Sequence, residues 1–254
     1  MKTIVRILSL PLIGLVCANF AQAQSTPASA KEEKSAVSSS AAAPAPRTDV
    51  YHVLFNHAAP GKAAALADFL KAGNPVAPVP GHVLVLRHQD GEPWDYVAIQ
   101  HLGTKATVEA AGNPRGAAMK DLSDWHDDTF VNGPSWAEFA KAMGIGDEGT
   151  SKSAESVYVV SVYRPLPGHQ DALEKFLSEP PARSNDLSAG NVLMQHLEGG
   201  AWRYLTISRY KSWQDLATSE SNSVAQSSKG EGGWFQLREH ISFHNDTLTY
   251  RVAP

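Results

Sequence analysis

An internal repeat limits the possible folds of this 254-residue chain more than any other feature of its sequence. Residues 51–61 match residues 158–168, and both stretches end in Pro-Gly. The offset between matching positions then grows along the chain, as small loop insertions require. It is 107 for the first stretch, 108 where 88–99 match 196–207, and 118 where 126–130 match 244–248. The sequence therefore predicts two related units in tandem.

The N-terminal part precedes both units and differs from them in composition. Residues 1–23 have the pattern of a secretory signal: Lys2 and Arg6, an apolar run, and the small-x-small cleavage site Ala21-Gln22-Ala23. Cleavage after Ala23 predicts a secreted or periplasmic protein. The predicted segments are a signal peptide (1–23), a disordered Ser/Ala/Pro tether (24–48), a first unit (49–145), a linker (146–155) and a second unit (156–254).

Charge and cysteine content exclude several classes of protein. The only cysteine, Cys17, lies within the predicted signal, so a disulfide framework is not expected. Removal of Lys2 and Arg6 with the signal changes the formal net charge from -4 to -6. Nucleic-acid binding requires clustered basic residues, and the chain has no such cluster. No membrane association is expected after cleavage, and the sequence does not predict an oligomeric state.

Each unit shows the same expected order of elements. An alternating strand leads through a Pro-Gly turn into a helix, and two strands joined by a Gly-containing hairpin follow. Ser212 and its counterpart Thr104 are suited to cap a second helical region. We expect a last helix over Met119–Trp125 or Phe235–Phe243 and then a final strand, although this last segment also suits a longer helix. The order β-α-β-β-α-β is that of the ferredoxin-like fold.

A ferredoxin-like sheet has helices on one face only, and its other face needs a partner. We therefore expect an α+β protein of two ferredoxin-like units, packed sheet to sheet as a fused pseudo-dimeric barrel. This arrangement resembles the dimeric α+β barrel superfamily, which includes antibiotic-biosynthesis-type monooxygenases, EthD-like and NIPSNAP-like proteins. The resemblance covers residues 49–254 and implies functions that range from cofactor-free oxygenases to haem enzymes.

Strand alternation predicts which side chains face the barrel interior. We expect Val97 and Ile99 to meet the helices, and the aromatic and polar side chains between them to point inward, where they could bind a small organic ligand. The alternative is that these rings simply fill a closed barrel. The candidate ligand-binding residues, including the matched hairpin histidines, are His52, Asn56, His88, Trp94, Tyr96, Tyr163, His196, Trp202 and Tyr204.

The matched His-[Asp/Asn]-Asp-Thr stretches supply the candidate catalytic residues. His126 with Asp128, and His244 with Asp246, could act as proton shuttle and orienting carboxylate. The alternative is a local turn in which Asp and Thr bond the backbone. His240 and His244 have the spacing of helical metal ligands, but the order Glu-His-x-x-x-His lacks the usual base position.

The function predicted from the sequence alone is binding of a small organic ligand in a cavity between the units. The alternative is a cofactor-independent monooxygenase-like or isomerase-like enzyme that uses a His/Asp pair. No cofactor and no metal are predicted, and a small molecule is the only partner expected.

Overall fold

The computed structural model describes residues 46–75, 77–108, 119–146, 155–179, 186–197 and 200–254. The expected signal peptide, most of the tether and most of the linker lie outside the described residues. The described residues from 46 to 254 form one compact unit. No helix in the described ranges is long and apolar enough to cross a membrane.

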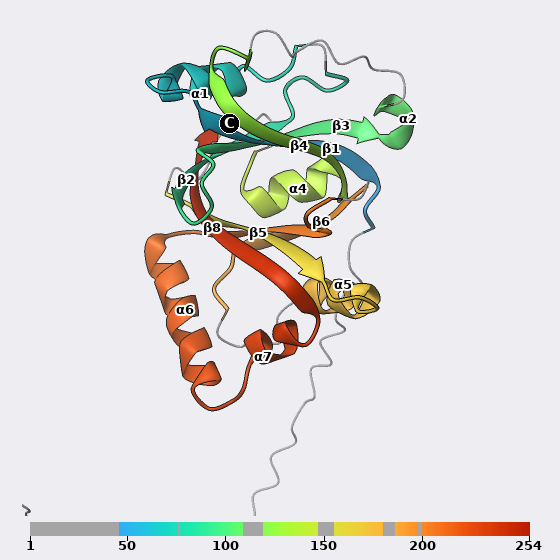
Figure 1. Cartoon of the computed structure of the whole chain (residues 1–254), viewed down its shortest axis with the longest axis vertical. Helices are drawn as coiled ribbons and strands as arrows, with labels where there is room; N and C mark the ends of the chain where they lie inside the picture. The colour runs from blue at the N-terminus through green and yellow to red at the C-terminus, as the bar shows by residue number, and fades with distance from the viewer. Residues whose placement is uncertain (1–45, 76, 109–118, 147–154, 180–185, 198–199) are drawn as a thin grey trace, which may run out of the picture. The chain divides into compact units, whose positions relative to one another are not determined.

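Eight antiparallel strands form a closed barrel in the order β1-β3-β2-β8-β5-β7-β6-β4 (Figure 1). The strands are β1 (Asp49–Ala58), β2 (Val83–Asp90), β3 (Tyr96–Thr104), β4 (Ser123–Gly133), β5 (Val157–Pro165), β6 (Gly190–His196), β7 (Tyr204–Tyr210) and β8 (Ile241–Ala253). The helices are α1 (Ala63–Lys71), α2 (Lys105–Val108), α4 (Trp136–Met143), α5 (Gln170–Ser178), α6 (Trp213–Ser227) and α7 (Gly233–Arg238). The α+β class expected from the sequence is confirmed.

Strand pairing repeats along the chain with the offsets of the sequence repeat. Across β1 and β3, Tyr51 lies opposite His101; across β5 and β7, Tyr158 lies opposite Arg209. The pairs that join the first half (residues 49–145) to the second half (residues 156–254) also correspond. They are His88–Thr249 between β2 and β8, and Val131–His196 between β4 and β6.

The two junctions between the halves differ in length. Strand β8 runs on to Ala253 beside β2, whereas β4 pairs with β6 only at Val131 and Asn132. Strand β4 ends because Gly133 packs against the Tyr51 ring and Pro134 has no N–H to donate. The chain then turns into α4, which lies between the strands of the two halves (Figure 1).

Local sequence explains both ends of α4. The Ser135 hydroxyl accepts from the Glu138 N–H, and the Glu138 carboxylate accepts from the Ser135 N–H, which forms a capping box. Gly144 ends the helix with a φ of 67°, a left-handed conformation that glycine adopts without steric cost. The capping-box pattern was available in the sequence, but the sequence analysis did not predict this helix.

The largest apolar cluster combines α4 with strands from both halves, so it is the cluster that the barrel encloses. The other clusters belong to the outer faces, where α1 covers β2 and β3 and α5 covers strands of the second half. The interior side chains are Tyr51, Val53, Phe55, Leu84, Leu86, Trp94, Val97, Ile99, Val131, Phe139, Ala140, Met143, Ile145, Tyr158, Val160, Val192, Met194, Trp202, Leu205 and Ile207.

The predicted assignment of strand faces is therefore wrong within the strands, although Trp94 and Trp202 lie in the interior as expected. Val97 and Ile99 fill the interior, whereas Tyr96 packs on α1 and donates its hydroxyl to the Ala63 carbonyl. Tyr204 likewise faces α5, where it bonds Glu174. Alternation separates two faces of a strand but does not show which one is enclosed. The candidate ligand-binding residues that lie on the outer face, against expectation, are His52, Asn56, Tyr96, Tyr163 and Tyr204.

The predictions for the end of each unit are corrected in part. Each half has the expected last strand, β4 or β8, but the first half continues beyond it into α4. Strand β4 already begins at Ser123, within the helix expected over Met119–Trp125. The helix expected over Phe235–Phe243 ends at Arg238. Ser212 caps α6 as predicted, since its hydroxyl accepts from the Asp215 N–H.

Candidate functional site

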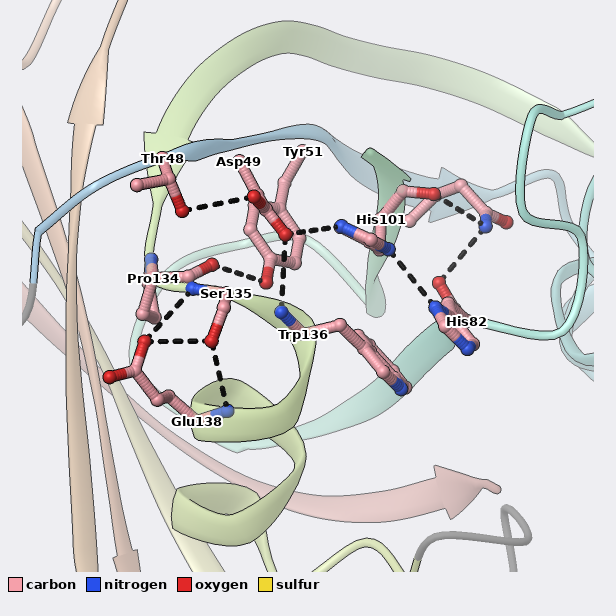
Figure 2. Close-up of polar contacts among 10 residues, drawn as sticks. Thr48, Asp49, Tyr51, His82, His101, Pro134, Ser135, Trp136 and Glu138 are labelled. Atoms are coloured by element: carbon pink, nitrogen blue, oxygen red, sulfur yellow. Dashed lines mark hydrogen bonds and ion pairs between the residues drawn. The ribbon is translucent and has the colours of Figure 1, made fainter. Parts of the chain in front are cut away.

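Four segments meet at the N-terminus of α4 and bring together Asp49, His82, His101 and Trp136 (Figure 2). Asp49 is the first residue of β1, and His101 lies on β3 opposite Tyr51. His82 immediately precedes β2, and Trp136 is the first residue of α4. These bonded residues are 19 to 87 positions apart in the sequence. Strand pairing in the barrel and the inward turn of the chain after β4 bring them together.

The Asp49 carboxylate is anchored on three sides. Its Oδ2 lies 2.8 Å from His101 Nε2 and accepts the Trp136 backbone N–H at 3.2 Å, while Thr48 Oγ1 lies 3.0 Å from Oδ1. The Trp136 N–H is one of the donors that a helix start leaves unpaired, and the helix dipole favours an anion there. The side chain of Asp49 is only 14% exposed, so these bonds hold it in place.

A chain of hydrogen bonds leads from Asp49 through His101 to His82. His101 Nδ1 lies 3.0 Å from His82 Nδ1. Because an ionised carboxylate only accepts, His101 must carry a proton on Nε2, and Nδ1 of the neutral ring is then an acceptor. His82 therefore donates from Nδ1, and its Nε2 is left with a lone pair.

His82 is half-buried and lies flat on the Trp136 indole, with ring centroids 4.2 Å apart and an interplanar angle of 8°. Burial lowers the pKa of His82, and the neighbouring His101 lowers it further. The ring is therefore neutral at pH 7. Among the described residues, no group forms a hydrogen bond with His82 Nε2, so this nitrogen can accept a proton from another molecule.

Two further side chains fix this arrangement. The Gln100 amide donates to the His82 carbonyl at 2.9 Å and to the Val79 carbonyl at 3.0 Å, which holds the loop before β2. The buried Tyr51 hydroxyl donates to the Pro134 carbonyl at 2.8 Å, and its ring lies 5.0 Å from that of His101. Burial, together with Asp49 and Glu138, raises the pKa of Tyr51 far above its usual range, so this phenol stays protonated and serves as packing.

The catalytic residues expected from the sequence do not converge. His126 and Asp128 lie on β4 and are exposed, and His52, not His126, bonds Asp128 at 3.0 Å. On β8, His244 Nε2 lies 3.8 Å from Asp246 and its ring stacks on Tyr163. These strands therefore carry separate surface His–Asp pairs.

The hairpin histidines have different environments despite their matched positions. His196 is 7% exposed, stacks on Trp202 and bonds Thr129 Oγ1. His88 lies 5.8 Å from Trp94, and its Nε2 is buried without a hydrogen-bond partner. Asn56 is fully buried on β1 and bonds the Leu54 carbonyl. The predicted ligand-binding residues thus spread over both faces of the barrel and do not form one cavity lining.

Asp49, His82, His101 and Trp136 were not singled out from the sequence. A usable signal was present, because these titratable residues stand where the repeat is broken. The positions that correspond to Asp49, His82 and His101 are Ser156, Gly190 and Arg209. The repeat was recognised from residues that match between the two halves, and these three positions do not match. Within the described ranges, no group of three or more His, Cys, Asp or Glu could hold a metal ion.

No protein-family model matches the chain, and no curated protein matches it in sequence. Several solved structures resemble it in fold. A proposed monooxygenase from Fusobacterium nucleatum has a TM-score of 0.53 at 9% identity, over 81% of this chain and 93% of that chain. An anthrone oxidase-like protein has a TM-score of 0.51 at 11% identity, over 82% of this chain and 92% of that chain. The expected resemblance is confirmed at the level of fold alone.

Proposed function

We propose that this protein is an enzyme that removes a proton from a small organic carbon acid, with His82 as the general base. The observation that carries the proposal is the hydrogen-bond chain Asp49–His101–His82, at whose end His82 Nε2 bonds no other described residue. This is the enzyme alternative of the sequence analysis, with a different His and a different Asp from those expected. The small ligand would bind beside His82 and Trp136.

Each residue has a defined part in the proton transfer. His82 Nε2 takes the proton from a C–H bond next to a carbonyl group, and the electron pair of that bond stays on the substrate as an enolate. The imidazolium that results keeps donating from Nδ1 to His101. His101 is oriented by Asp49, whose charge stabilises the positive ring system. Return of the proton to another carbon gives isomerisation, and reaction of the enolate with O2 gives oxygenation.

The name of one of the two structural neighbours suggests a first substrate to test. One of them is anthrone oxidase-like, and anthrone is a flat ketone with an acidic CH2 group. Its oxidation by O2 converts this CH2 into a second carbonyl group and releases one water, so that one oxygen atom of O2 goes to each product. Proton removal from the CH2 is the step assigned to His82.

The test separates proton removal from oxidation. Under nitrogen and in D2O, the wild-type protein should speed deuterium entry into the CH2 group of anthrone, followed by NMR. Replacement of the base, His82→Gln, should reduce that rate by roughly 10²–10⁴-fold. The control His57→Gln changes an exposed histidine of the same half that pairs with Asp124, and it should leave the rate unchanged.

Other outcomes would count against the proposal. A His82→Gln protein that exchanges deuterium at the wild-type rate would show that His82 is not the base. If His126→Gln or His244→Gln removed exchange instead, one of the surface pairs predicted from sequence would carry the chemistry. If anthrone shows no exchange, the same measurement is made on a panel of cyclic and open-chain 1,3-diketones. Absence of deuterium exchange with every one of these compounds would overturn the proposal.

We also infer that the barrel is a fused pseudo-dimer of two ferredoxin-like units, 49–145 and 156–254. The supporting observation is that strand order within each half, β4-β1-β3-β2 and β8-β5-β7-β6, is the same. The equivalent partners Tyr51–His101 and Tyr158–Arg209 support it further. In this arrangement only the first unit carries the base, because the second has Arg209 and Gly190 at the corresponding positions.

A further inference from the structure

A second pair of histidines lies in the second half, away from the site described above. His169 precedes α5, and His240 lies between α7 and β8. Their Nδ1 atoms are 3.0 Å apart, and their ring centroids are 5.4 Å apart. Both residues are half-exposed, and among the described residues neither ring has a carboxylate within ion-pair distance or another hydrogen-bond partner. The proposed reaction does not use them.

Backbone hydrogen bonds hold His169 and His240 next to each other. The Leu166 N–H donates to the His240 carbonyl at 2.9 Å, and this bond ties the β5–α5 turn to the end of α7. Each histidine is also fixed within its own turn, since His169 N–H bonds the Leu166 carbonyl and His240 N–H bonds the Leu237 carbonyl, both at 3.0 Å. His169 occupies the N-cap position of α5, but its side chain makes no capping bond and turns to His240 instead. The pair is therefore preorganised.

We propose that His169 and His240 bind a divalent transition-metal ion, with Cu(II) as the preferred ion and Ni(II) next. Two nitrogens 3.0 Å apart and each about 2.0–2.1 Å from a metal subtend an angle of about 91–97°. This is close to the right angle of tetragonal Cu(II) and square-planar Ni(II), and narrower than the tetrahedral angle that Zn(II) prefers. Among divalent first-row metals, imidazole sites bind Cu(II) most strongly.

The remaining coordination positions go to water. Within the described ranges no third His, Cys, Asp or Glu completes a cluster, so a metal held by this pair must be accessible to solvent. The half-exposure of both rings meets this condition. The His82–His101 pair has the same Nδ1–Nδ1 distance, but His101 is only 5% exposed and water cannot complete the coordination shell around it. In that pair, Asp49 also fixes a hydrogen bond between the rings.

The experiment adds Cu(II) alone to the full chain freed of any histidine tag. Titration calorimetry should show one Cu(II) per chain, and the EPR spectrum should show a tetragonal Cu(II) with two nitrogen ligands. Binding should weaken as the pH falls, because both imidazoles must be deprotonated to ligate. His169→Gln and His240→Gln should each remove this Cu(II), and circular dichroism with thermal unfolding confirms that each variant folds.

Matched variants make the proposal falsifiable without relying on one substitution. His126→Gln, which changes an exposed histidine on β4, should leave the stoichiometry and the EPR spectrum unchanged, as should His82→Gln. The proposal is overturned if His169→Gln and His240→Gln, both folded, bind Cu(II) as the wild type does. It is also overturned if the wild type binds no Cu(II), or if His82→Gln removes the ion.

Discussion

The two ends of α4 lie against different halves of the barrel, and the side chains that meet the two ends carry opposite charge. At the N-terminus of the helix, the Trp136 N–H donates to the Asp49 carboxylate. At the C-terminus, Arg209 Nε donates to the Ala142 carbonyl at 2.8 Å, and Arg251 donates to the Met143 carbonyl at 3.3 Å. An acidic group thus meets the positive end of the helix, and cations meet its negative end.

This difference shows how one helix that lies between the two halves places different charged groups on each of them. The helix dipole and its unpaired backbone groups favour an anion on one side and cations on the other. A carboxylate at position 49 can then orient His101. Arg209, which corresponds to His101 in the second half, instead bonds a backbone carbonyl at the C-terminus of the helix. The second half has Gly190 at the position that corresponds to His82, and a Cβ there would lie 2.0 Å from the Ala142 carbonyl oxygen. The proposed proton transfer is consequently confined to the first half.

The largest expected effect tests the acidic side of this comparison. Asp49→Asn should lower the rate of deuterium exchange by roughly 10²-fold, since the amide no longer fixes the proton on His101 Nε2. ¹⁵N NMR of the histidine rings should show a change of tautomer at His101. The corresponding change, Ser156→Ala, removes a buried hydroxyl that bonds no other described residue, so it should leave the rate unchanged. Equal losses from both variants would contradict the assignment of the chemistry to one half.

A smaller effect on stability is expected at Gly190. A Cβ there would lie 2.0 Å from the Ala142 carbonyl oxygen and 2.8 Å from the Ala142 Cα, so α4 or β6 must move. Gly190→Ala should lower the free energy of unfolding by about 1–3 kcal/mol, measured by urea denaturation. The control Gly81→Ala meets no atom within 4 Å and should change stability by less than about 0.5 kcal/mol. If Gly190→Ala were neutral, close contact between α4 and β6 would not explain the glycine.

The smallest effect concerns pH. Because burial and His101 lower the pKa of His82 below 6.5, the unfolded chain binds more protons than the folded one between the two pKa values. The contribution of this residue to stability is therefore lost as the pH falls through that window. His57 has the opposite sign: its bond to Asp124 raises its pKa, so its contribution is lost as the pH rises.

The two contributions can be separated by urea titrations at several pH values between 5 and 8. His82→Gln should reduce the loss of stability on the acid side, and His57→Gln should reduce the loss on the alkaline side. NMR titration should give a lower midpoint for the His82 ring than for the His57 ring. The reverse order of midpoints would show that His82 is not buried as described.

Matched residues predicted the fold class and most of the element order. The strand that contains Tyr51, the Pro-Gly turn, the amphipathic helix and the hairpin recur in both halves, and each signal is local in sequence. Helix α4 was not predicted, because the first half was expected to end with a helix over Met119–Trp125 and a strand after it. The capping box at Ser135 and Glu138 was a local signal for this helix.

The candidate site could not be assembled from signals that are local in sequence, and the reason is physical. His82, His101 and Asp49 come from separate segments, and only the pairing of β1 with β3 and the inward course of α4 bring them within hydrogen-bond distance. The choice of the enclosed face was equally open, because an aromatic-polar face can line a barrel or lie under helices. Packing of the apolar face of α4 decided it, with Phe139 and Met143 buried among the strand side chains.

By itself, the sequence determined what depends on neighbouring residues: the repeat, the two periodicities of strands and helices, the turns, and the α+β class. The tertiary structure alone decided which strand face is enclosed, where β4 ends beside β6, and which histidine is backed by a carboxylate. These features depend on contacts between residues far apart in the chain, and such contacts are selected by packing and by the pairing of buried polar groups.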